Sequence, residues 1–168
     1  ASRTDIQGDL VLLEEQDRAK WNRAQIIEGE AIIDSVLRQA PPGPYALQAA
    51  IAAVHAQTVD GGVTDWPQIV QLYDRLLEQS PSPVVELNRA VAVAMVEGAQ
   101  VGLELIDAIA ESGALRGYYP LHAARADLLQ RSARYAEAAR AYARAAELTL
   151  NIAERRFLNR RREEMQDH

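Results

Sequence analysis

Apolar residues recur at spacings of three and four along most of the chain, and short stretches rich in proline and glycine separate these runs. Because an α-helix has 3.6 residues per turn, this spacing places the apolar side chains on one helix face. No stretch alternates well enough to predict a strand, and LVLL at 10–13 is either extended or the entry to the first helix. The pattern therefore predicts an all-α chain. The expected helices span 17–39, 45–57, 66–79, 83–97, 100–111, 119–131, 135–149 and 151–165.

Several helix starts carry recognisable capping residues. Asp65 is expected to cap the helix that opens with WPQIV, and Gln68 follows three residues later as a capping-box partner. Ser82 followed by Pro83 provides an N-cap and a first helical turn whose φ is preset by the proline ring. Pro120 has the same role after GYY. Short loops between the expected helices predict antiparallel neighbours.

One apolar pattern, spaced by four and then three residues, recurs in three of the expected helices. The three sets are Ile69, Tyr73 and Leu76; Gly102, Ile106 and Ile109; and Ala138, Tyr142 and Ala145. Their corresponding positions lie 33 and 36 residues apart. Ala90 and Ala126 lie twelve residues before Gly102 and Ala138, so small residues occupy matched points on the preceding helices. The chain therefore contains an internal repeat of helix pairs.

This repeat resembles the tetratricopeptide (TPR) repeat, a unit of about 34 residues in which two antiparallel helices meet through small side chains. Small residues at a crossing let two helix axes approach closely. The match is degenerate, and it predicts a right-handed TPR-like solenoid with units at 44–80, 83–112 and 119–150 and a capping helix from 151. An N-terminal extended segment and helix, 1–43, would pack on this array. We expect Ala90 and Ala126 to be buried.

Composition limits the possible partners and compartments. The net charge is −6, which disfavours direct nucleic-acid binding by this chain, and the arginines of ERRFLNRRREEMQDH are nearly balanced by acids on a solvated helix. Cysteine is absent, which fits a reducing cytoplasm. No apolar run approaches the ~20 residues that span a bilayer, and the first residues do not resemble a signal peptide. We expect a cytoplasmic protein that does not bind membranes.

Motifs for catalysis or metal binding are missing from the sequence. His55, His122 and His168 are widely separated, and none belongs to a HExxH arrangement. GxSxG, P-loop and GxGxxG patterns do not occur, and Gly61-Gly62 fits a turn. We therefore expect a protein that is not an enzyme and that needs no cofactor or metal.

Polar residues on otherwise apolar helix faces are the candidates for partner binding. Asn88 and Arg89 lie on the first helix of the middle unit, the helix type that lines the concave face of TPR arrays, and His122 and Arg125 hold comparable places in the third unit. The alternative is structural: the two arginines pair with nearby acids, and His122 is a satisfied residue between helices. Both interpretations stay open at the level of sequence.

Several blocks, in order, resemble the C-terminal extension of a subgroup of extracytoplasmic-function (ECF) sigma factors, the alternative sigma subunits of bacterial RNA polymerase. The blocks are SRTDIQGDLVLLEEQDRAKWNRAQIIEG, PGPYALQAAIAAVHA, TDWPQIVQLYDRLLEQSPSPVVELNRAVAVAMVEG and GYYPLHAARADLLQRSARYAEAARAYARAAELTLNIAERRFL. The resemblance implies a TPR-like appendage behind the two sigma domains that bind core polymerase and promoter DNA. Those domains are not in this sequence, so the chain is expected to be part of a longer protein.

The resemblance implies a regulatory role in transcription initiation, through contacts with polymerase, with the sigma domains or with a separate regulator; DNA binding would belong to the full-length protein. A free-standing TPR-like adaptor for a peptide or protein is the main alternative, and an enzyme in a helical scaffold is a third. The sequence departs from the repeat at Leu150, which stands where a terminal proline is expected. The junction before the last helix should therefore be continuous or bent.

Overall fold

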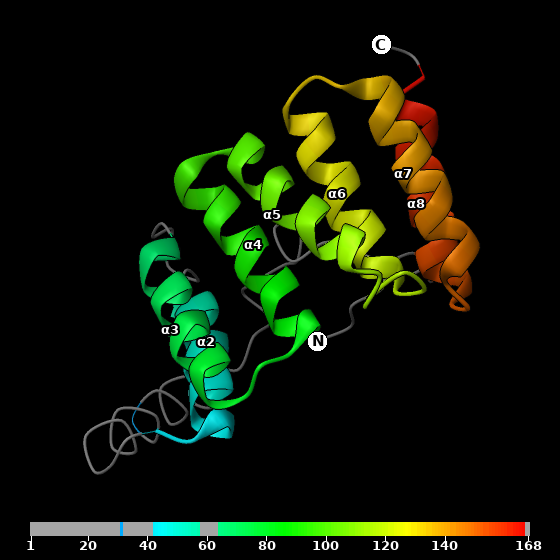
Figure 1. Ribbon diagram of the computed structural model, residues 1–168. Coiled ribbons are helices and arrows are strands. Elements are labelled where there is room, and N and C mark those ends of the chain that lie inside the picture. Colours follow the sequence, from blue (N-terminus) through cyan, green and yellow to red (C-terminus); the bar gives the residue numbers. More distant parts are fainter. Residues whose placement is uncertain (1–30, 32–41, 58–63, 167–168) are drawn as a thin grey trace. The chain divides into compact units, whose positions relative to one another are not determined.

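The computed structural model describes residues 31, 42–57 and 64–166. Within these residues the regular structure is entirely α-helical, which confirms the predicted fold class (Figure 1). The helices are α2 (Pro44–Gln57), α3 (Trp66–Gln79), α4 (Pro83–Glu97), α5 (Ala99–Ser112), α6 (Tyr119–Arg131), α7 (Tyr135–Leu148) and α8 (Ile152–Glu164). Their bounds differ from the predicted ones by one residue at most. The helix predicted at 17–39, the segment at 10–13 and nearly all of the N-terminal region 1–43 lie outside the described residues.

Helix starts follow the predicted capping residues. The side chain of Asp65 accepts a hydrogen bond from the backbone N–H of Gln68 at 2.9 Å, at the start of α3. Helix α4 begins at Pro83, and Pro120 lies in the first turn of α6. These residues satisfy backbone donors or preset φ where a helix leaves its first N–H groups without partners.

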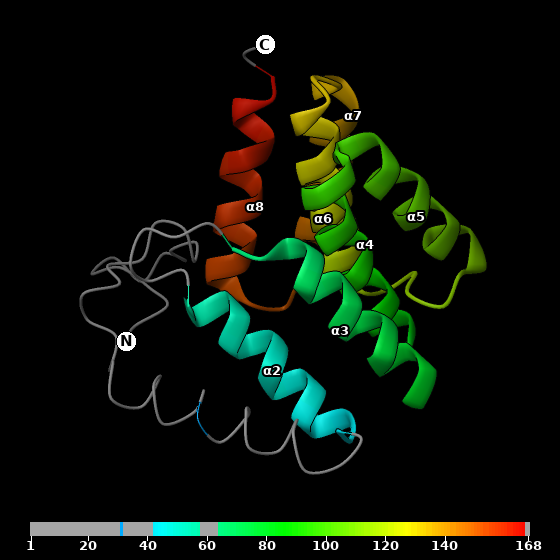
Figure 2. The same cartoon turned by 90° about the vertical axis from the view of Figure 1, so that its left-hand side faces the viewer.

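The described helices form two compact units, one of α2 to α4 and one of α5 to α8. The boundary falls between α4 and α5, within the predicted middle repeat 83–112. In the first unit α2 packs against α3 (Figure 2). Trp66, Val70, Tyr73 and Val85 pack partly buried against its core. That core consists of Leu47, Ala50, Ile51, Val54, Ile69, Leu72, Leu76 and Ala92.

In the second unit α6 packs against both α5 and α7, and α7 packs against α8. The turns between α6 and α7 and between α7 and α8 are each three residues long, so these helices form antiparallel hairpins. Small and large apolar residues alternate in its interior, as close packing of helices requires. The buried side chains include Leu103, Ile106, Leu121, Ala126, Leu128, Leu129, Ala138, Tyr142, Ala145, Leu158 and Met165.

All repeat positions are buried except Tyr73, which is partly buried. Ala90 and Ala126 are 1% and 0% exposed, and Gly102, Ala138 and Ala145 are buried as well. Small side chains at these depths allow close contact between helices. The helical hairpins of the TPR-like pattern are therefore consistent with the structure, while the right-handed superhelical path of the array stays a prediction.

The expectation of a continuous or bent junction at Leu150 is wrong. Helix α7 ends at Leu148 and α8 begins at Ile152. The side chain of Asn151 accepts hydrogen bonds from the backbone N–H groups of Ala153, at 2.9 Å, and Glu154, at 3.4 Å. An asparagine N-cap, one residue after the position where the repeat expects proline, thus separates the two helices.

Candidate partner-binding site

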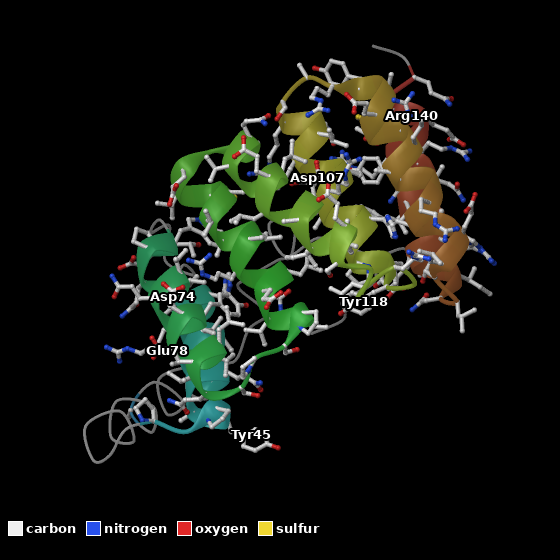
Figure 3. All side chains as sticks on the ribbon, viewed as in Figure 1. Tyr45, Asp74, Glu78, Asp107, Tyr118 and Arg140 are labelled. Carbon is white, nitrogen blue, oxygen red and sulfur yellow. The ribbon has the colours of Figure 1, made fainter. Side chains whose placement is uncertain are left out.

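Arg89, one of the four candidate binding residues, is held in an ion pair. Its Nε lies 2.5 Å from Oδ1 of Asp74, and so joins α4 to α3. Figure 3 labels Asp74 on α3. The side chains of Arg89 and Asp74 are 31% and 46% exposed to solvent. At such a partly solvated position an ion pair contributes no more than about 1 kcal/mol to stability. The pair therefore orients the guanidinium more than it stabilises the fold.

Arg125 is held in the same way in the second unit. Its Nε lies 2.6 Å from Oδ1 of Asp107, which joins α6 to α5. The exposures of these two side chains, 29% and 43%, are close to those of the first pair. Each of the two arginines thus reaches back from its own helix to an aspartate on the preceding one.

The two ion pairs occupy equivalent repeat positions. Asp74 and Asp107 lie 33 residues apart, each directly after the central residue of its apolar set. Arg89 and Arg125 lie 36 residues apart, each directly before a buried crossing alanine. These are the same intervals that separate the apolar sets. The internal repeat therefore includes an inter-helix ion pair as well as a packing pattern.

A third arginine continues the series but has different partners. Arg161 lies 36 residues after Arg125, on α8, while Ala143 takes the aspartate position on α7. The Nη2 of Arg161 donates to Oε1 of Gln130 at 2.7 Å, and its Nη1 donates to Glu164 at 2.9 Å. Its guanidinium also lies 5.9 Å from the centre of the Tyr142 ring.

Tyr142 and Gln130 complete this junction. The Tyr142 hydroxyl donates to Oε1 of Gln130 at 3.2 Å, so the glutamine oxygen accepts from both Tyr142 and Arg161. Burial raises the pKa of Tyr142 above its ordinary value, and the positive charge of Arg161 acts against this rise. The sequence analysis did not select Arg161, although the 36-residue interval was enough to find it.

The other two candidate residues differ from each other. His122 contacts the backbone oxygen of Arg116 through Nε2, at 3.2 Å, and so ties α6 to the turn that precedes it. Asn88 is exposed, and its side chain makes no hydrogen bond within the described residues. Arg89 and Arg125 thus pair with nearby acids, as the structural alternative expected, while the partner of His122 lies in a turn and not on a second helix. Partner binding by this set stays a prediction, and Asn88 is its member without an intramolecular role.

In 42–57 and 64–166, no three His, Cys, Asp or Glu side chains gather in a way that could hold a metal ion. The rings of His55 and Trp66 make a T-shaped contact, with centroids 5.2 Å apart, and burial lowers the pKa of His55. A neutral histidine against an indole fits a packing role. None of the helices that the structure describes has the length and apolar character to cross a membrane.

Comparisons with known proteins give one informative match. No family model matches the sequence, and no solved structure matches it. An uncharacterized protein of Rhizobium meliloti (strain 1021) is 44% identical over 157 residues, which is 94% of this chain. The chain spans 37% of the length of that relative. A sequence similar to nearly all of this chain thus occurs in a bacterial protein more than twice as long.

Proposed function

We propose that this chain is the regulatory protein-interaction domain of an ECF sigma factor, and that it modulates transcription initiation by bacterial RNA polymerase in the cytoplasm. The observation that carries the proposal is the ordered resemblance of its sequence blocks over nearly the whole chain. The longer bacterial relative supports it, because a sigma factor needs further domains for promoter and core-polymerase binding. The domain would act without catalysis or cofactor.

The charge supports a role through protein contacts. With a net charge of −6, the chain repels the DNA backbone, and promoter binding would belong to other domains of the longer protein. Helix pairs with buried small residues form a stable scaffold on which surface side chains can be presented to a partner protein. Polymerase, the sigma domains and a separate regulator are the candidate partners.

Transcription in vitro tests the proposal. The full-length protein and a variant that lacks residues 1–168 of the present numbering are each combined with core polymerase and a cognate promoter. We expect the deletion to change transcript yield several-fold while promoter DNA affinity is retained in part. Equal yields from both proteins at every tested concentration, together with equal output from a promoter reporter in cells, would contradict a regulatory role.

A free-standing adaptor is the second candidate, and the exposure of Asn88 beside Arg89 favours it. The test uses Asn88→Ala, which removes no intramolecular hydrogen bond, and Asp74→Asn, which releases Arg89 from its ion pair. If α4 binds a peptide, Asn88→Ala should weaken binding and Asp74→Asn should alter it, with helicity unchanged by circular dichroism. Binding that is indifferent to both changes would assign these residues to the fold alone.

A further inference from the structure

Exposed apolar side chains gather at one end of the α5–α8 unit. Leu150 is 96% exposed, Ile152 59% and Tyr118 37%. Within the described residues five large hydrophobic side chains are exposed in this way, and the other two, Tyr45 and Val96, belong to the other unit. A single exposed leucine is ordinary, but a group of apolar side chains on one surface is typical of a contact site.

Hydrogen bonds join the two segments that carry these exposed side chains. The Tyr119 hydroxyl, next in sequence to Tyr118, donates to Glu154 on α8, and burial together with this carboxylate raises the pKa of Tyr119 to about 12. Thr149 Oγ1 donates to Oε2 of the same Glu154 at 2.5 Å. The start of α6 and the α7–α8 turn therefore lie side by side, and Figure 3 shows Tyr118 beside the ends of α7 and α8 that meet at this turn.

Positive charge adjoins the apolar group. Arg155 and Arg156 are exposed and lie three and four residues after Ile152, so they share its helix face. The side chain of Arg155 makes no ion pair or hydrogen bond with the described residues. Glu154 is the one acidic residue between Leu148 and Arg162. Tyr118, Leu150, Ile152 and Arg155 are called the turn surface below.

The side chain of Leu150 does not contribute to the packing of the fold. It lies 69 residues after Pro81, the same interval that separates Ile69 from Ala138, so it holds the position where another repeat ends in an exposed proline. Asn151 already caps α8. Burying a leucine side chain contributes roughly 2 kcal/mol. Folding leaves Leu150 exposed, so a partner that covers this side chain would gain that contribution in binding free energy.

We propose that the turn surface binds an acidic protein segment with bulky apolar side chains, one of whose carboxylates faces Arg155 and whose apolar groups cover Leu150, Ile152 and Tyr118. The distance over which charges interact favours a short acidic segment over an extended anionic surface as the partner. A membrane or a DNA duplex meets the field of the whole chain, whose net charge of −6 repels it. A short segment meets mainly the arginines within a Debye length of about 8 Å. The proposal does not depend on the sigma-factor assignment.

The test selects partners from a random peptide library displayed on phage. Selection uses the whole chain, with counter-selection on the variant Leu150→Ser with Ile152→Ser. We expect enriched peptides to contain both acidic and bulky apolar residues. An enriched peptide is then synthesised, and its affinity is measured by fluorescence anisotropy at low and at physiological ionic strength.

The serine double variant should weaken binding at least about tenfold, and Arg155→Glu about tenfold with a smaller salt dependence. Tyr45→Ser, at a side chain that is 88% exposed on α2, and Arg140→Glu, at an exposed site on α7, are the controls and should leave affinity unchanged. Circular dichroism checks that every variant is folded.

Three outcomes would overturn the proposal. The first is that no peptide is enriched, or that the enriched peptides are basic. The second is that the two controls weaken binding as much as the turn-surface variants do. The third is that the chain binds vesicles of phosphatidylcholine and phosphatidylglycerol through Leu150 and Ile152 and binds no peptide, which would make the surface a membrane contact.

Discussion

At the scale of single residues, the end of α6 shows how much a local sequence pattern determines. Ala133 has φ 56°, in the left-handed region that disfavours residues with a Cβ. Its N–H donates to the Gln130 carbonyl at 2.9 Å, and the Arg134 N–H donates to the Leu129 carbonyl at 2.9 Å. These two bonds form a Schellman motif, whose left-handed position is usually glycine. Because the segment 131–134 has no glycine, the sequence pattern did not predict this geometry.

Replacing Ala133 with glycine should stabilise the protein. Glycine adopts positive φ without steric cost, and the gain of roughly 1 kcal/mol should exceed the loss from greater chain entropy in the unfolded state. Urea unfolding measures the change. The control is Ala139→Gly, at a half-buried position inside α7, which should destabilise the protein instead. Destabilisation by both substitutions would show that the left-handed conformation of Ala133 costs little.

A second residue-scale prediction concerns His55 and pH. Burial lowers the pKa of His55 from 6.5, so the unfolded chain binds its proton at a higher pH than the folded chain does. The contribution to stability is fully present above pH 6.5 and is lost as the pH falls below that value towards the folded-state pKa. We expect the free energy of unfolding to decrease over this window in acid.

Unfolding curves at several pH values, compared with His55→Phe, isolate this contribution. The phenylalanine variant keeps an aromatic ring against Trp66 but has no proton to bind, so its stability should depend less on pH between 6.5 and the folded-state pKa. NMR titration of the histidine ring gives that pKa directly. Identical pH profiles for both proteins would exclude His55 as the source.

At the scale of helices, sequence pattern predicted the elements better than their contacts. Apolar spacing, proline and Asp65 predicted the bounds of α3 and α4, because these signals act within one helix. The acids that pair with Arg89 and Arg125 were left open, since they lie on neighbouring helices, 15 and 18 residues earlier. The break before α8 was missed because the missing proline was given more weight than the asparagine that caps the helix.

The repeated ion pair predicts the effect of one substitution. Ala143 occupies the position of Asp74 and Asp107, so Ala143→Asp should place a carboxylate near Arg161. We expect Ala143→Asp to be more stable than Ala143→Asn by up to about 1 kcal/mol, since aspartate and asparagine differ mainly in charge. The advantage should decrease as salt is added.

A double-mutant cycle with Arg161→Met shows whether the new charge acts through Arg161. If the two Ala143 variants are equally stable at low salt, the equivalence between α8 and the earlier helices does not extend to this pair.

The residue after Arg161 already departs from the repeat pattern. Arg162 stands where the crossing alanine Ala126 is found 36 residues earlier, and its buried Nε has no hydrogen-bond partner within the described residues.

At the scale of the whole molecule, the all-α class and the burial of Ala90 and Ala126 followed from the sequence, because repeated spacing forces repeated packing. The candidate site followed only in part. Helical period places Asn88 and Arg89 on α4, but it does not say whether a guanidinium is already paired. The turn surface could not be found from periodicity, since Leu150 and Tyr118 lie beside helices rather than within their apolar faces.

Helix α8 should act as the cap of the second unit. Its Leu158 is buried, and so is the adjoining Met165, while its exposed side chains are mainly charged. Ending the chain after Leu150 should expose apolar surface of α7, including Tyr142 and Ala146, and a terminal repeat without a polar cover is prone to associate. We expect increased binding of the dye ANS and a shift to larger species in size-exclusion chromatography. A monomeric truncated protein that binds no more ANS than the intact chain would contradict this role.

The recurrence of one aspartate–arginine pair at two helix junctions also has an evolutionary consequence. A gene segment that encodes the aspartate on one helix and the arginine on the next encodes both partners of the ion pair. An extra copy inserted in frame therefore brings both charges with it. Tandem duplication could therefore lengthen such a chain without a new complementary mutation at each added boundary.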